Sequence, residues 1–146
     1  MLVEIMVAVS ILALVIMSSI TGLLMANREA AAYRALSAAR LVVERNIETA
    51  LAVTYDATTT PAILATTTAT GSVYDDDGGG DNLVNLLVQD TAGTNIVLKG
   101  TLTRIVVAEP NAQNSPIKRI TFRLNFTFRG RPYATEMTTL RAIDDF

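Results

Sequence analysis

LVEIMVAVSILALVIMSSITGLLMA, residues 2–26, decides the fold of this chain. Every residue in it is apolar or small except Glu4, and no further charge follows until Arg28. About 20 apolar residues are enough for a helix to cross the hydrocarbon core of a bilayer. The stretch contains no proline, the residue that most strongly interrupts a helix. The sequence therefore predicts, at the start of the chain, a helix that is long and apolar enough to cross a membrane.

The helical pattern continues beyond the apolar stretch. Residues 27–53 contain no glycine or proline and are rich in Ala, Leu, Arg and Glu, which are strong helix formers. We expect one helix from about Leu2 to Val53, with an apolar half over residues 1–27 and an amphipathic half over 28–53. Apolar residues of the second half recur at steps of three and four positions, as on one face of a helix; they are Ala32, Leu36, Ala39, Val43, Ile47 and Leu51.

Residues 54–146 predict a globular head domain that is rich in strands. KRITFRLNFTFRG, at 118–130, alternates apolar and polar residues, which is typical of a strand with one buried face. Residues 133–142 predict a last strand after a turn bracketed by Gly130 and Pro132. Residues 95–109 predict a hairpin that turns at Lys99–Gly100, and the run at 83–88 fits either a strand or a helical turn.

Three or four antiparallel strands with one apolar face need a cover, and the amphipathic half of the helix is the obvious candidate. The expected fold class is therefore α+β, with a long N-terminal helix packed on a small antiparallel sheet.

The composition excludes several classes of function. The 146 residues include no Cys and no His, and the net charge is −2. Without Cys there is no disulfide, thiolate metal site or cysteine nucleophile, and without His a Ser-His-Asp triad within the chain is impossible. No phosphate-binding loop is present. We therefore expect a protein that is not an enzyme and has no resident cofactor, and the net charge gives no reason to expect nucleic-acid binding.

The acidic stretch DDDGGGDN at 75–82 is a candidate calcium site, because Ca²⁺ prefers several oxygen ligands. It lacks the closing Glu of an EF-hand loop, so a solvated surface loop is the competing interpretation, and the one we favour. The candidate ligands are Asp75, Asp77, Asp81 and Asn82.

A basic face is expected on the exposed side of the strand at 119–129. Such a face could contact DNA phosphates. It could instead meet an acidic loop of a neighbouring subunit, which is the interpretation we favour. The basic residues are Arg119, Arg123 and Arg129, with Arg131 nearby.

LVEIMVAVSILALVI at 2–16, followed by a helix-on-sheet domain, resembles the N-terminal motif of the type IV pilin and pseudopilin superfamily. The resemblance implies a structural subunit that polymerises through its N-terminal helix into a pilus-like extracellular filament, for adhesion, motility or DNA uptake. It also implies a prepilin peptidase, an assembly ATPase, a platform protein and a secretin as partners. Subunits would wait in the inner membrane and end at the cell surface.

Two alternatives stay open at this point. One is a minor pseudopilin of a type II secretion or competence system. The other is a membrane-anchored binding domain that never polymerises.

The resemblance also assigns roles to residues of the apolar stretch. Glu4 is expected to set the axial register of subunit addition by meeting the N-terminal amine of a neighbour at Met1; a simple position at the membrane interface is the competing interpretation. The family glutamate is usually fifth in the mature chain and here stands fourth, so we expect Met1 at or near a mature N-terminus left by leader cleavage, where it would be methylated. Gly22 is the candidate for helix flexibility. The residues expected to pack in a filament core are Leu2, Val3, Ile5, Val7, Ile11, Leu14 and Val15.

Overall fold

The computed structural model describes residues 2–56, 58–67, 72–73, 82–91, 94–110 and 117–144. The chain divides into two compact units, residues 1–34 and 35–146. The first unit holds the N-terminal part of helix α1 (Leu2–Ala52), and the second holds the rest of α1 and the strands.

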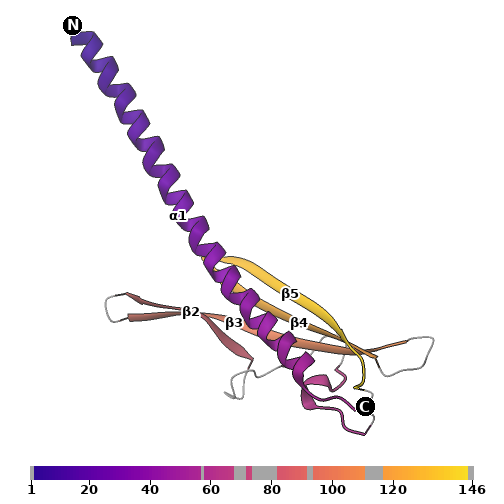
Figure 1. The fold of residues 1–146 in the computed structure, drawn as a ribbon. Coiled ribbons are helices and arrows are strands. Elements are labelled where there is room, and N and C mark those ends of the chain that lie inside the picture. Colours follow the sequence, from indigo (N-terminus) through magenta and orange to yellow (C-terminus); the bar gives the residue numbers. More distant parts are fainter. Residues whose placement is uncertain are drawn as a thin grey trace. The chain divides into compact units, whose positions relative to one another are not determined.

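Helix α1 runs without interruption from Leu2 to Ala52 (Figure 1), which confirms the prediction of one long helix. The buried stripe of α1 differs in part from the predicted one. Leu36 and Ile47 only border the core, and Leu51 is 43% exposed. Small alanines dominate the centre of the contact, so the helix can approach the sheet closely while larger side chains lie at its flanks. The buried residues are Ala35, Ala39, Val43, Asn46 and Ala50.

An irregular segment follows α1 and leads to the short 3₁₀ helix η1 (Ala62–Leu64) and the two-residue strand β1 (Ser72–Val73). Tyr55, Ile63 and Leu64 of this region are buried and belong to the hydrophobic core. The segment that follows the helix is thus part of the packed domain.

Among the described residues, the sheet has five antiparallel strands. Strand β3 (Thr94–Glu109) pairs on one side with β4 (Ile117–Phe128), and β4 pairs with β5 (Arg131–Arg141). On its other side, β3 pairs with β1 and with β2 (Leu83–Thr91), so the run at 83–88 belongs to a strand. The expected α+β class, a long helix packed on an antiparallel sheet, is confirmed.

Strand β3 continues straight through Lys99–Gly100, so the predicted hairpin turn at this dipeptide is wrong. Gly100 lies opposite Phe126 on β4, and a Cβ placed on Gly100 would lie 2.8 Å from Cδ2 of Leu124. Glycine inside a strand often marks such a close approach. Here the core side chain of Leu124 occupies the space that a side chain at residue 100 would need.

Strand β4 confirms the alternation read from the sequence. Its inner face is the centre of the core, where Ile120, Phe122 and Leu124 are fully buried. Leu102 and Val106 of β3 join the same core. The outer face is mainly solvent-exposed, which is the usual arrangement of an antiparallel sheet covered on one side only.

The turn between β4 and β5 consists of Arg129 and Gly130, with φ angles of 51° and 76°. Two consecutive positive φ values are characteristic of the two-residue type I′ hairpin turn. A turn after β4 was predicted between Gly130 and Pro132, and the structure places it earlier, at Arg129 and Gly130, because the type I′ turn needs its two residues at positive φ. Pro132 lies just inside β5, a strand at the edge of the described sheet, where proline is tolerated.

Candidate assembly surface

The first unit presents a continuous apolar surface. Every described residue from Leu2 to Ala30 is exposed, and α1 contains an 18-residue window that is long and apolar enough to cross a membrane, with 0% of it buried. A core helix or a signal sequence can meet the same length and composition criteria, but this window is not covered by the described part of its own chain. The residues expected in a filament core are 53% to 75% exposed; they are Leu2, Val3, Ile5, Val7, Ile11, Leu14 and Val15.

Three hydroxyl side chains within this surface hydrogen-bond to their own helix. The hydroxyls of Ser10, Ser19 and Thr21 donate to carbonyls four residues earlier, at distances of 2.8, 2.9 and 2.8 Å. Such back-bonding satisfies a hydroxyl without any outside partner. These three residues can therefore lie in an apolar environment at little cost, although they are not apolar themselves.

Glu4 lies in the first turn of α1 and is exposed. Met1, its expected partner on a neighbouring subunit and the expected site of methylation, lies outside the described residues. The helix passes through Gly22 without a break, and a Cβ there would meet nothing within 4 Å. No contact within the described chain therefore requires glycine at this position, and its role in flexibility stays a prediction.

In the second unit, the residues that follow α1 are held by the end of β5. Arg141 donates from Nη2 to the carbonyl of Val53, 3.1 Å away, and to Oδ2 of Asp144, 2.6 Å away. Tyr55 and Asp144 share two further hydrogen bonds. The Tyr55 N–H donates to Oδ2 of Asp144 at 2.9 Å, and the Asp144 N–H donates to the carbonyl of Tyr55 at 2.7 Å. These four residues, named the clasp here, fix the end of α1 to the last strand.

Two more basic residues hold the same region. Arg104 of β3 donates to the carbonyl of Ala62, and Lys118 of β4 donates to the carbonyl of Leu64 at 2.7 Å. The Lys118 ammonium also lies 5.1 Å from the ring centroid of Tyr55. Strands β3, β4 and β5 thus each supply one cation to backbone carbonyls of residues 53–64.

Sequence reasoning missed the clasp and these two cations. One signal was available, because Arg104 and Lys118 fall in phase with the buried residues of their strands, Leu102 and Val106 on β3 and Ile120 on β4. A basic residue in phase with an apolar face needs a polar partner on that face.

Burial and hydrogen bonding shift the pKa values of two of these charged groups. The N–H of Tyr55, aided by the Arg141 guanidinium, holds the pKa of Asp144 below its ordinary value because both stabilise the carboxylate. Desolvation lowers the pKa of Lys118 because burial disfavours the ammonium.

The four predicted basic residues do not form one continuous face. Arg119 and Arg123 are exposed on the outer face of β4, and Nε of Arg119 is paired with Glu109 at 2.7 Å. Arg129 lies in the turn, over the ring of Phe128. Arg131 is opposite Phe128 in the register and therefore shares the inner face. The four residues therefore do not line up as one basic stripe along β4. Of the two arginines on the outer face of β4, Arg123 is the one without an ion pair among the described contacts.

The candidate calcium ligands Asp75, Asp77 and Asp81 lie outside the described residues. Asn82 is described, and its carbonyl accepts the N–H of Leu102 at 2.8 Å. Within the described ranges, no group of three or more acidic side chains is placed to hold a metal ion.

No protein-family model, no curated protein and no solved structure matches this chain.

Proposed function

We propose that this chain is a structural subunit that polymerises through residues 2–26 of α1 into a type IV pilus-like filament. The observation that carries the proposal is the apolar surface of the first unit, whose large side chains are exposed around the whole helix. An exposed apolar surface of this extent needs a lipid or protein cover. A bilayer before assembly and a bundle of like helices afterward would both provide it.

The position of charge along α1 supports the same function. Glu4 is the only charged residue before Arg28, whereas the part of the helix in the second unit carries several charges. An isolated charge at bilayer depth costs roughly 2.5 to 3.5 kcal/mol, and the helix dipole returns only about 0.3 to 1 kcal/mol. An amine at the N-terminus of a neighbouring subunit would offset the rest. A buried pair that forms in only one register acts as a specificity device.

The filament would be assembled by partner machinery. The sequence has no phosphate-binding loop, so ATP hydrolysis would come from a separate ATPase, and a platform protein and a secretin would complete the path to the cell surface. Subunits would wait in the inner membrane with residues 2–26 in lipid. Transfer from lipid to a helix bundle exchanges one apolar environment for another, so it need not carry a large hydrophobic penalty.

Electron microscopy of material sheared from the surface of native cells tests the proposal. We expect long filaments composed mainly of this chain, and an intact mass that retains the apolar stretch. Short assemblies confined to the inner membrane would favour a minor pseudopilin instead. Monomers that remain in the membrane would favour an anchored binding domain, and loss of the apolar stretch from the mature mass would identify a cleaved signal sequence.

Glu4→Gln tests the role of the charge, with Glu29→Gln as the matched control on the same helix. Both changes remove one carboxylate and keep the side-chain shape. We expect Glu4→Gln to reduce filament yield while the membrane-bound monomer persists, and Glu29→Gln to assemble normally. Normal filament yield from Glu4→Gln would show that this carboxylate does not set the register.

A further inference from the structure

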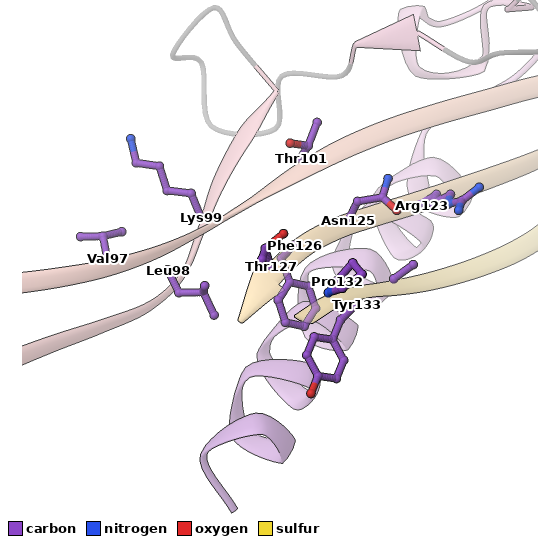
Figure 2. A pocket seen from close by; sticks show the side chains of 11 residues that line it. Val97, Leu98, Lys99, Thr101, Arg123, Asn125, Phe126, Thr127, Pro132 and Tyr133 are labelled. Carbon is purple, nitrogen blue, oxygen red and sulfur yellow. The ribbon is translucent and has the colours of Figure 1, made fainter. Parts of the chain in front are cut away.

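The sheet opens into a fork where β3 and β4 separate. Their pairing ends at Gly100 and Phe126, so residues 94–99 of β3 pair only with β2, and the last two residues of β4 pair only with β5. A hollow of about 650 Å³ lies at this point. Figure 2 shows Lys99, Thr101, Arg123 and Asn125 on one side of the fork, and the rings of Phe126 and Tyr133 on the other.

The outer side of the fork carries two positive charges. Lys99 and Arg123 are both exposed, and neither forms an ion pair within the described part of the chain. Glu136 is opposite Arg123 in the β4–β5 register but is not among its bonded partners there. Asn125 and Thr101 add polar groups on the same side. This cluster of charge and hydrogen-bonding groups suits a carboxylate-bearing ligand.

Backbone donors strengthen this preference. The N–H of Leu102 points to the β2 side, where it donates to the carbonyl of Asn82. Successive residues of a strand direct their N–H groups to opposite sides, so the N–H groups of Val97 and Lys99 point to the side that β4 vacates. They are available to an acceptor in the fork.

The chain itself contains a segment with the complementary charge. Residues 75–81, named the acidic segment here, contain four aspartates and no basic residue. The described residues on either side of it are held at the edge of β3 away from the fork: Val73 pairs with Thr103, and Asn82 accepts from Leu102. The described residues that flank the acidic segment therefore lie on the side of β3 opposite to the fork.

We propose that the fork of one copy binds the acidic segment of the next copy through Lys99 and Arg123. This inference rests on the proposed function as a filament subunit and names one contact between its head domains. A contact between two different surfaces of identical chains is heterologous, and where the rotation between copies does not close a ring it propagates along an open helical polymer. It would add to the helix contacts in the core and would set the angle between neighbouring heads.

Disulfide trapping tests the contact, because the chain has no cysteine of its own. The test variant carries Asp76→Cys and Thr127→Cys, which places one thiol in the acidic segment and one in the exposed lining of the fork. The control carries Asp76→Cys and Val107→Cys, with the second thiol exposed on β3 away from the fork. Both are oxidised in native cells, analysed on denaturing gels and imaged for filaments.

We expect a ladder of covalent multimers from the test variant and monomers from the control. Filaments without a ladder would overturn this contact and leave the proposed function standing. A monomer that migrates faster after oxidation would overturn it too, because the segment would then close on its own chain. A ladder without filaments would support the contact and overturn the filament function, and the absence of both would overturn both.

Charge reversal provides a second measurement. Lys99→Glu with Arg123→Glu, added to the test variant, is expected to abolish the ladder because the acidic segment would meet like charge. Changing Asp75 and Asp77 to Lys in the same chain is expected to restore it. A ladder that survives the first reversal would show that these two cations do not hold the neighbouring copy.

Discussion

Leu14→Arg is expected to prevent stable membrane integration, whereas Leu41→Arg is expected to leave it intact. Both leucines belong to α1, and they are 69% and 64% exposed. The two variants therefore introduce the same side chain on the same helix at nearly the same exposure. They differ only in the environment that the proposed function assigns to each site.

The magnitude follows from the position of Leu14 along the helix. It lies 12 residues after Leu2, which is about 18 Å at 1.5 Å per residue, so it is close to the midplane of a hydrocarbon core about 30 Å thick. Arginine at the centre of a membrane helix costs about 2.5 to 3.5 kcal/mol on insertion scales. Since about 1.4 kcal/mol is a factor of ten, integration should fall by roughly two orders of magnitude.

Extraction of membranes at alkaline pH is the assay. We expect Leu41→Arg to remain in the membrane pellet like the unmodified chain, and Leu14→Arg to be released or degraded. Equal retention of the two variants would refute the assignment of residues 2–26 to lipid. Leu14→Ala, which removes the leucine without adding charge, should stay in the pellet.

Four further substitutions test the second unit and the backbone. Phe122→Ala should lower the free energy of unfolding by about 3 to 5 kcal/mol, because the fully buried ring leaves a cavity, and thermal denaturation followed by circular dichroism would measure it. Gly130→Ala should cost about 1 to 2 kcal/mol, because φ is 76°, whereas Gly22→Ala should favour the helix by about 0.5 to 1 kcal/mol; equal shifts in Tm would contradict this. Because Tyr55 N–H lowers the pKa of Asp144, the stabilisation should be present above the ordinary pKa of 3.8 and be lost as pH falls through the lowered value. Asp144→Asn should remove this pH dependence from urea unfolding curves, and an unchanged acid limb would contradict it.

The helix and β4 were predictable because their patterns are local. An uninterrupted run of helix formers specifies α1 whatever it packs against, and strict alternation specifies the buried face of β4. Gly100 shows where local reasoning fails. A Lys-Gly pair between two apolar runs favours a turn on local grounds. In the structure, however, residue 100 has room only for glycine because the side chain of Leu124 on the neighbouring strand fills the adjacent space. A contact between strands that are distant in sequence is not visible in the dipeptide.

The clasp was not predictable for the same physical reason. Arg141 and Val53 are 88 residues apart, and Tyr55 and Asp144 are 89 apart, so no spacing in the sequence brings them together. The buried stripe of α1 shows a subtler limit. Periodicity identified the correct side of the helix near Ala39 and Val43. The residues buried against the sheet are, however, mainly alanines, and the larger Leu51 is not among them.

The two parts of α1 differ in which side chains they bury, although the helix is continuous. Residues 2–26 expose large apolar side chains, whereas the buried stripe of residues 35–50 uses mainly small side chains against its own sheet. Small side chains such as alanine interlock little with a neighbouring surface, so packing alone would hold the helix only weakly against sliding along the sheet. The hydrogen bonds of the clasp supply that resistance, because any shift of residues 35–52 along the sheet must break the bonds that Val53 and Tyr55 make with β5 and the residues after it. If the chain polymerises through residues 2–26 as proposed, the clasp would resist a pull along α1 on the part of the helix that packs against the sheet.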